Sequence, residues 1–144
     1  MPKIILCRGI QGSGKTTYAK QWVLEDPEYR VRFNNDDIRN MLGKYWVPSR
    51  EAFISDLKNS FLYEAMSYGF DIIIDNMNLN PKEVEYYGRV VKDWNKVRTS
   101  YEIEFKDFFI PLQDCIDRDA KRPNPISEEV IRATYERYEN ILKV

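Results

Sequence analysis

The stretch Gly9-Ile10-Gln11-Gly12-Ser13-Gly14-Lys15-Thr16 fills every position of the phosphate-binding loop motif G-x-x-x-x-G-K-[ST]. It follows the apolar run Lys3-Ile4-Ile5-Leu6-Cys7 and precedes a stretch that favours a helix, Tyr18–Val23. A strand before the motif and a helix after it are the context in which such loops bind phosphate. The sequence therefore predicts a working phosphate-binding loop (P-loop) rather than a glycine-rich turn that only joins two elements.

The residue types of this loop suit a bound polyphosphate. Glycines let backbone N–H groups point into one concavity and approach an anion closely, and the helix that follows adds its positive N-terminal end. Lys15 can reach the β- and γ-phosphates of a nucleoside triphosphate, and the Thr16 hydroxyl can ligate Mg²⁺. We expect ATP, or another nucleoside triphosphate, to bind at Gly9, Gln11, Gly12, Ser13, Gly14, Lys15, Thr16 and Thr17.

Length and composition limit the alternatives. The 144 residues are enough for one domain and too few for two, so we expect a single domain over residues 1–144. A net charge of -1 gives no bulk electrostatic case for nucleic-acid binding, although a local positive patch would still allow it. The chain has no histidine, which excludes histidine-based triads, histidine metal sites and histidine general bases.

The cysteines and the hydropathy pattern indicate the cellular setting. Cys7 and Cys115 are expected to be buried reduced thiols, because two cysteines in a P-loop protein do not make a disulfide framework. No apolar stretch approaches the length of a membrane span, and no signal peptide precedes the first strand. The sequence thus favours an intracellular enzyme of the cytoplasm, or of the host cytoplasm if a phage encodes it, with no membrane partner.

Strands and helices alternate along the chain. We expect strands at Lys3–Arg8, Tyr29–Phe33 and Phe70–Ile74 and within Arg98–Phe109. We expect helices at Lys15–Glu25, from Asn34 or Asn35 to Leu42, from a cap at Ser49 to Gly69, from Asn80 onward, at Pro111–Lys121, and from Ser127 to Leu142. This alternation predicts an α/β fold in which a parallel β-sheet is flanked by helices on both faces. In such folds ligands bind beyond the carboxyl ends of the strands.

An acidic segment, Asn34-Asn35-Asp36-Asp37-Ile38-Arg39, follows the second expected strand. A carboxylate at this edge of the sheet, near a bound phosphoryl group, can accept a proton from a hydroxyl. Arg39 lies one helical turn beyond Asp36 and can hold a phosphate of the acceptor in bidentate fashion. The segment also suits a plain helix start, since asparagine caps helices and acids complement the helix dipole. Taken alone, it favours neither interpretation.

A second polar segment, Asp75-Asn76-Met77-Asn78, follows the apolar strand Ile72–Ile74. An aspartate that ends a hydrophobic strand of a P-loop protein is typical of the acid that holds Mg²⁺ directly or through water. The alternative is an asparagine-rich turn, because asparagine tolerates left-handed backbone. We favour a metal role for Asp75 and place Asp75 and Asn78 beside the substrate, although the later asparagines equally suit turn and cap positions.

Two arginines, Arg118 and Arg122, share one helix face just before Pro123 and Pro125. In a P-loop enzyme such a pair can close over the donor phosphates as a lid and neutralise charge while the phosphoryl group moves. The alternative is a solvated face whose arginines pair with acids such as Asp119. The position before a proline-rich bend favours the lid.

One aromatic pair, Tyr45-Trp46, stands between Lys44 and Arg50. Basic and aromatic residues together can contact backbone phosphates and stack on bases. Most other aromatics of the chain suit the core or helix packing. The sequence therefore indicates residues 44–50 as the aromatic-rich segment that touches substrate.

Together these motifs resemble the kinase domain of phage-type polynucleotide 5′-hydroxyl kinases, and they match it in order over nearly the whole chain: Gly9–Thr16, Asn34–Arg39, Asp75–Pro81 and Arg118–Arg122. Many families share the P-loop, whereas the Asp36–Arg39 spacing and the arginine pair are more specific. The resemblance implies the P-loop kinase fold, ATP and Mg²⁺ as cofactors, and transfer of the γ-phosphate to a 5′-hydroxyl end of DNA or RNA.

The resemblance also implies a role for each matching residue. Lys15 and Thr16 would bind phosphates and Mg²⁺, and Asp36 would be the general base on the 5′-hydroxyl. Arg39 would grip a phosphate of the acceptor strand, and Arg118 and Arg122 would form the lid on ATP. The family often has Asp-any-Thr-Asn after its middle strand, and here Met77 stands in the threonine place. Larger relatives carry a phosphatase domain, for which these residues leave no room.

Three other functions remain compatible with the sequence. A small-molecule kinase would act on a nucleoside, a nucleotide or another alcohol, and a modified-base kinase would act on hydroxyl groups within DNA. A non-catalytic nucleotide switch would use the P-loop without needing the Asp36 carboxylate. The sequence carries no signal for DNA against RNA, for the preferred triphosphate or for the oligomeric state.

Overall fold

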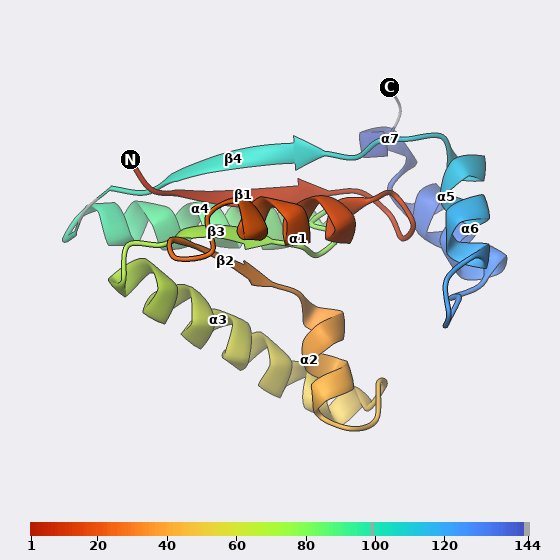
Figure 1. Ribbon diagram of the computed structural model, residues 1–144, viewed down its shortest axis with the longest axis horizontal. Helices are drawn as coiled ribbons and strands as arrows, with labels where there is room; N and C mark the ends of the chain where they lie inside the picture. Colours follow the sequence, from red (N-terminus) through yellow and green to blue (C-terminus); the bar gives the residue numbers. More distant parts are fainter. Residues whose placement is uncertain (99, 143–144) are drawn as a thin grey trace.

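The fold is a four-stranded parallel β-sheet with helices on both faces, seen in a computed structural model that describes residues 1–98 and 100–142 (Figure 1). The strands lie in the order β2-β3-β1-β4. They are β1 (Lys3–Arg8), β2 (Arg30–Phe33), β3 (Asp71–Ile74) and β4 (Glu102–Asp107). The helices are α1 (Lys15–Glu25), α2 (Asn35–Met41), α3 (Glu51–Ser67), α4 (Pro81–Asn95), α5 (Leu112–Ala120), α6 (Glu128–Arg137) and α7 (Glu139–Leu142).

The two central strands, β1 and β3, form the buried centre of the sheet. They pair in parallel with Ile4 opposite Ile72 and Leu6 opposite Ile74, and these four side chains are fully buried. Strands covered on both faces need continuous apolar runs rather than alternating patterns, as these two strands have. This burial fixes the register, and it brings the loops that follow β1 and β3 to the same edge of the sheet.

Helices cover the sheet from both sides, as predicted. Helices α3 and α4 pack on one face, where Leu62 and Tyr87 join the core with Leu6 and Ile74. Helix α1 packs on the other face, in front of the sheet in Figure 1, and buries Trp22 against the strands. The predicted α/β architecture, with parallel strands and flanking helices, is confirmed.

The last three helices gather at the carboxyl end of the sheet, at the right of Figure 1. They form a separate apolar cluster in which Cys115, Ile131 and Leu142 pack against Ile10 of the P-loop and Leu79. This cluster anchors α5 next to the P-loop. The arginines on α5 and just beyond it are therefore carried to the place where the sequence predicts a lid.

Two local predictions differ from the structure. Ser49 does not cap α3, because Pro48–Arg50 forms a short 3-10 turn and Arg50 precedes the helix without a side-chain cap. The last predicted helix divides at Tyr138 into α6 and α7. The fourth strand lies within the predicted segment, as an edge strand with mostly exposed side chains, and residue 99 of that segment lies outside the described residues.

The cysteine prediction is confirmed, since Cys7 and Cys115 are both free and buried. Burial raises the pKa of the Cys7 thiol to about 12, so the group stays protonated and unreactive at neutral pH. In the described part of the chain, each helix is too short or too polar to cross a membrane.

Candidate active site

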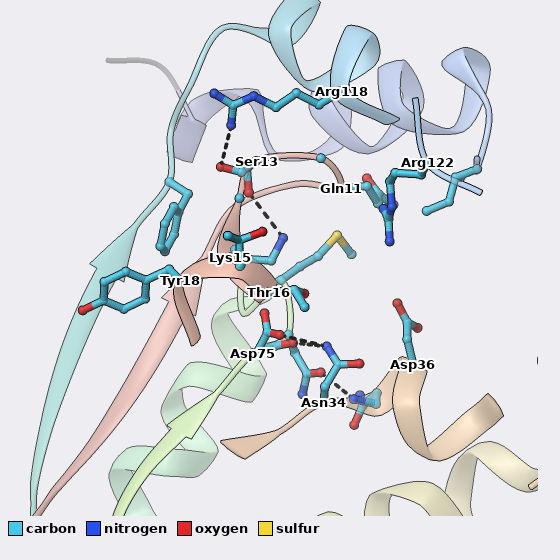
Figure 2. Close-up of a pocket in the computed structure, with 18 of the residues that line it drawn as sticks. Gln11, Ser13, Lys15, Thr16, Tyr18, Asn34, Asp36, Asp75, Arg118 and Arg122 are labelled. Atoms are coloured by element: carbon cyan, nitrogen blue, oxygen red, sulfur yellow. Dashed lines mark hydrogen bonds between the residues drawn. The ribbon is translucent and has the colours of Figure 1, made fainter. Parts of the chain in front are cut away.

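An open cleft of about 1100 Å³ lies beyond the carboxyl ends of the strands (Figure 2). The P-loop, the segment after β2, the segment after β3 and the arginines near the end of α5 all contribute to its walls. The sequence predicts fourteen site residues, and all except Gly9 and Asn78 line this cleft: Gln11, Gly12, Ser13, Gly14, Lys15, Thr16, Thr17, Asp36, Arg39, Asp75, Arg118 and Arg122.

Two glycines shape the P-loop because their backbones are left-handed, with φ of 78° at Gly12 and 100° at Gly14. A Cβ on Gly12 would also collide with the carbonyl of Cys115, so the loop and α5 pack in direct contact. Gly9 lies below the loop, where its N–H donates to the Met77 carbonyl at 3.2 Å. A Cβ on Gly9 would lie only 2.9 Å from the Phe108 carbonyl oxygen, so the residue allows close packing there, and it does not line the cleft.

Lys15 is held inside the curve of the loop. Its Nζ donates to the Ile10 carbonyl at 2.8 Å and to the Ser13 hydroxyl at 3.4 Å, and the residue is only 9% exposed. Burial lowers the pKa of Lys15 from 10.5 to about 8, and the nearby Asp75 carboxylate opposes the shift. A desolvated ammonium in a concavity of backbone donors is a strong electrostatic partner for phosphate oxygens.

The depressed pKa of Lys15 predicts how stability depends on pH in the absence of nucleotide. Between about pH 8 and pH 10.5 the unfolded chain keeps a proton that the folded protein has released, so folding becomes more favourable as pH rises. Below this window the buried ammonium destabilises the fold. Lys15→Met removes the group, so its gain in Tm over the unmodified protein should be larger at pH 7 than at pH 10. A gain that does not change with pH would contradict the burial of a charged Lys15.

Asp75 is anchored by one carboxylate oxygen and leaves the other without a partner. Its Oδ2 accepts from Arg32 Nε at 3.0 Å and Nη2 at 2.8 Å, and the Asn34 amide donates to its backbone carbonyl. Among the described residues no hydrogen bond reaches the buried Oδ1. Asp75 lies between Thr16 and Asn34 at the floor of the cleft (Figure 2).

The two oxygen donors Thr16 and Asp75 fit Mg²⁺, which prefers oxygen ligands and keeps most of its shell from phosphates and water. The described residues hold no cluster of three or more Asp, Glu, Cys or His side chains that would build a complete protein cage for a metal. The predicted use of Asp75 in metal binding thus stays a prediction, and the unpartnered Oδ1 supports it. The anchoring guanidinium of Arg32 was not predicted from sequence.

The acidic segment after β2 divides its two roles between neighbouring aspartates. The Asn34 side chain caps α2 by accepting from the Asp37 N–H at 2.9 Å, and the Asp37 carboxylate pairs with Arg32 at 2.6 Å. Asn34 therefore supplies the cap, and both aspartates lie in the first turn, where acids complement the helix dipole. Asp36 differs from Asp37 in that its carboxylate points into the cleft across from Arg122 (Figure 2).

One oxygen of Asp36 is fixed by two donors. Arg39 Nη1 donates to Asp36 Oδ1 at 2.6 Å, and the Tyr45 hydroxyl donates to the same atom at 2.8 Å. Arg39 is itself held by Glu51, through Nε to Oε2 at 3.1 Å and Nη2 to Oε1 at 2.6 Å. This chain of contacts fixes Asp36 through Oδ1, and no hydrogen bond from the described residues reaches its Oδ2.

Of the two residues that support Asp36 and Arg39, the sequence indicated Tyr45 and did not indicate Glu51. Glu51 carried no signal, because an acid in the first turn of a helix is an ordinary feature. Its bidentate contact with Arg39 lowers the pKa of the Glu51 carboxyl, so the pair stays ionised at neutral pH. Tyr45 belongs to the 44–50 segment that the sequence indicates, and it lines the cleft.

The lid arginines differ in their surroundings. Arg118 Nη1 donates to the Ser13 carbonyl of the P-loop at 3.4 Å, and no ion pair holds Arg118 among the described residues. Arg122 points into the cleft from the side opposite Asp36 (Figure 2), with only a long contact of 3.5 Å to Asp119. Both arginines are exposed, and the Arg122–Asp119 pair is the one that a solvated face would make. Both also line the cleft, so the lid stays a prediction beside that alternative.

The turn that carries Arg122 is closed by Asp119, a role that the sequence did not reveal. This buried carboxylate accepts from the Ile126 N–H with both oxygens, at 3.2 and 3.0 Å. The bond ties the end of α5 to Ile126, two residues before the start of α6. Residues 121–125 thus form a short loop with fixed ends next to the P-loop.

Asn78 is a structural residue and not a cleft residue. It is buried in a left-handed conformation with φ of 51°, and its amide donates to the carbonyls of Cys7 at 2.7 Å and Ile74 at 3.0 Å. These bonds tie the ends of β1 and β3 together beneath the P-loop. The placement of Asn78 beside the substrate is corrected to the turn role that the sequence also allowed.

Comparisons with known proteins agree with this geometry. The sequence model of the AAA domain family matches residues 4–141. L-seryl-tRNA(Sec) kinase of Methanococcus maripaludis is 26% identical over 141 residues, which cover 94% of this chain and 52% of that protein. A putative bifunctional polynucleotide kinase/RNA ligase of Autographa californica nuclear polyhedrosis virus is 23% identical over 155 residues, which cover 94% and 21% of the two proteins.

Among solved structures, a chain of the Pnkp1/Rnl/Hen1 RNA repair complex has a TM-score of 0.80 to this fold, at 22% identity over 96% of this chain and 44% of that chain. The chain therefore spans about half the length, or less, of these three proteins. The family model nonetheless accounts for nearly all of the sequence, and the sheet, P-loop and cleft agree with it. The chain belongs to the AAA domain family and has the α/β fold of P-loop kinases.

Proposed function

We propose that this domain transfers the γ-phosphate of ATP, or of another nucleoside triphosphate, to the 5′-hydroxyl end of DNA or RNA in the presence of Mg²⁺. The observation that supports this proposal most is the orientation of the Asp36 carboxylate. Its carboxylate faces the P-loop across the cleft, with one oxygen fixed by Arg39 and Tyr45 and the other free. A nucleotide-binding protein that only switches shape has no need of a carboxylate oriented in this way.

In the proposed reaction Asp36 Oδ2 accepts the proton of the 5′-hydroxyl while the oxygen of that hydroxyl bonds to the γ-phosphorus. The bond from the γ-phosphorus to the β-phosphate oxygen breaks, and ADP leaves. Lys15 and the two lid arginines neutralise charge on the moving phosphoryl group. Thr16 and Asp75 would hold Mg²⁺, which would supply further charge neutralisation at the phosphates.

Arg39 connects the general base to the acceptor. A guanidinium has five N–H donors, and Asp36 and Glu51 engage three of those of Arg39. Two donors remain for a phosphate on the cleft side, where Arg39 lines the wall. This supports an acceptor whose first nucleotide carries a 3′-phosphate, as every polynucleotide with a 5′-hydroxyl end does.

Replacing Arg39 with alanine tests the choice of acceptor. Both a nucleoside and a nucleoside 3′-phosphate should react more slowly, because Asp36 loses an orienting donor. The nucleoside 3′-phosphate should lose about 10- to 100-fold more in kcat/KM, since a charge-assisted hydrogen bond contributes about 1.5–3 kcal/mol. Arg89→Ala is the matched control, because Arg89 is an exposed arginine of α4 that lines neither the cleft nor the hollow between α3 and α4. Equal losses for the two acceptors would remove Arg39 from acceptor binding.

The lid segment, residues 116–126, should order when nucleotide binds. Arg118 and Arg122 bring two positive charges to one side of the cleft, and phosphates between them would relieve their repulsion. Hydrogen exchange across residues 116–126 should therefore slow in the presence of a non-hydrolysable ATP analogue. Arg122→Ala should lower kcat more than it raises the KM for ATP, whereas Arg132→Ala, which breaks only a surface pair with Glu128, should change neither. Identical exchange with and without the analogue would contradict a moving lid.

A second acceptor class is favoured by one observation. The relative from Methanococcus maripaludis is an L-seryl-tRNA(Sec) kinase by name, and it matches 94% of this chain. A hydroxyl carried by a charged tRNA is therefore the chief rival to a 5′-hydroxyl end. Small-molecule alcohols come next, because the P-loop, Asp36 and the lid would serve any of these acceptors equally well.

A further inference from the structure

A small hollow of about 220 Å³ lies between α3 and α4, beside the active-site cleft. Its walls are Ser55, Lys58, Asn59, Lys82, Glu83 and Tyr86. Glu83 lines both this hollow and the cleft, so the two spaces are neighbours. Nothing in the reaction described above uses this hollow.

Lys58 is the unusual residue of the hollow. It is only 8% exposed, and its Nζ lies 5.5 Å and 5.2 Å from the ring centroids of Tyr86 and Tyr87. Within the described residues no hydrogen bond or ion pair reaches its ammonium, and burial lowers the pKa of Lys58. The Glu83 carboxylate in the same wall opposes this shift without forming an ion pair with Lys58. Buried lysines are normally paired, so an ammonium whose nearest described partners are ring faces suits an anion supplied by a ligand.

The other walls of the hollow favour an anion as well. The Tyr86 hydroxyl donates to Asn59 Oδ1 at 2.7 Å, which leaves the Asn59 Nδ2 amide as a donor. Ser55 adds a hydroxyl, and Lys82 adds a second ammonium at the start of α4. Glu83 is the one acid in this wall, so the hollow carries a net positive charge in its described lining.

We propose that this hollow binds an internucleotide phosphate of the acceptor strand, one or more nucleotides beyond the reacting 5′ end. The proposal rests on the proposed function, because only a polynucleotide acceptor presents further phosphates at a distance from Asp36. A strand that leaves the cleft past Glu83 reaches the hollow directly. The domain thereby recognises a strand through a local positive site, even though its net charge is -1.

The test is equilibrium binding of single-stranded 5′-hydroxyl oligonucleotides, labelled at the 3′ end, measured by fluorescence anisotropy without ATP. Lys58→Gln should weaken binding of an octanucleotide about tenfold, as expected for loss of one buried charge-assisted contact. It should leave binding of a nucleoside 3′-phosphate unchanged, because that ligand ends before the hollow. Lys92→Gln is the matched control, since Lys92 is an exposed lysine of α4 outside both cavities.

Oligonucleotides with a single neutral methylphosphonate linkage identify the phosphate. Neutralising the linkage that occupies the hollow should weaken binding to the unmodified protein. The same neutral linkage should cause no further loss of affinity in Lys58→Gln, because this variant already lacks the ammonium that contacts the phosphate. The proposal fails if Lys58→Gln binds every oligonucleotide like the unmodified protein, if it loses affinity equally for all lengths, or if the unmodified protein binds no oligonucleotide. Inorganic phosphate could instead compete with oligonucleotide binding while no neutral linkage changes the affinity. That result would mean that the hollow binds free phosphate, and it also overturns the proposal.

Further variants and a comparison with activity separate a true loss of binding from misfolding. Lys58 is buried, so Lys58→Met and the exposed Lys82→Gln provide second variants, and thermal unfolding checks that each variant folds. Lys82→Gln should show the same dependence on length with a smaller loss. Because binding is measured without ATP, a wild-type protein that binds oligonucleotides but never phosphorylates them refutes the proposed function and leaves this inference standing.

Discussion

Lys15→Met is expected to lower kcat for phosphoryl transfer by at least about 100-fold, the loss typical of removing one preorganised group that stabilises charge in a transition state. The fold should remain intact, because the hydrogen bonds that Nζ makes to described residues go to the Ile10 carbonyl and the Ser13 hydroxyl of its own loop. The interaction with the moving phosphoryl group strengthens in the transition state, so kcat should fall more than ATP affinity.

The measurement is steady-state transfer from ATP, with thermal unfolding to confirm the fold. Lys20→Met is the matched control, since Lys20 is an exposed lysine of the same helix and lies outside the cleft. Near-normal turnover by a folded Lys15→Met protein would show that the P-loop of this chain does not bind the transferred phosphate.

Asp36→Asn should lower kcat by about 10²–10⁴-fold, the range that a positioned general base contributes. Asparagine keeps the size of the side chain and can still accept from Arg39 and Tyr45, so the geometry should survive while the basicity is lost. ATP affinity, measured by calorimetry or by competition, should stay close to that of the unmodified protein.

Asp37→Asn is the control for this variant, because Asp37 is the neighbouring acid and pairs with Arg32 instead of facing the cleft. It should keep transfer within a few-fold of the unmodified protein. If both variants lose activity equally, the segment acts through charge or stability and Asp36 is not the base. If neither loses activity, a different group takes the proton.

The sequence predicted the parts of this site that depend on local order. The P-loop needs eight consecutive residues, and the strand and helix around it follow from short apolar patterns, so β1 and α1 have the predicted bounds. The parallel sheet then brings loops from distant parts of the chain to one edge, which is why Lys15, Asp36, Asp75 and Arg118 line one cleft.

The sequence did not reveal contacts that depend on tertiary placement. Choosing between Asp36 and Asp37 required knowing where Arg32 lies, and Arg32 is on a strand. Glu51 reaches Arg39 only because the chain between them turns back, which no periodicity records. Asp119 looked like a surface acid, and its burial against the Ile126 N–H became visible only in the folded turn.

Asn78 is a residue that the sequence placed in the site and that has a structural role instead. A polar residue after a central strand of a P-loop protein looks like part of the site, and its neighbour Asp75 does line the cleft. The backbone at Asn78 is left-handed, so its side chain turns back to the carbonyls that end β1 and β3. The hydrogen-bonding needs of those strand ends decided its role, and they depend on how the strands are paired.

Transfer of the γ-phosphate to a 5′-hydroxyl end can be tested directly by a phosphate-transfer assay with γ-labelled ATP and Mg²⁺ across a panel of acceptors. The panel holds 5′-hydroxyl DNA and RNA oligonucleotides, their 5′-phosphorylated forms, nucleosides, nucleotides and a seryl-tRNA. If the domain phosphorylates 5′-hydroxyl ends, label should appear at the 5′ end of the 5′-hydroxyl oligonucleotides, and phosphatase should remove it. The 5′-phosphorylated forms should stay unlabelled, and Asp36→Asn should lose the transfer. Label that appears instead on the seryl-tRNA or on small alcohols, with none on any 5′-hydroxyl end, would contradict this function.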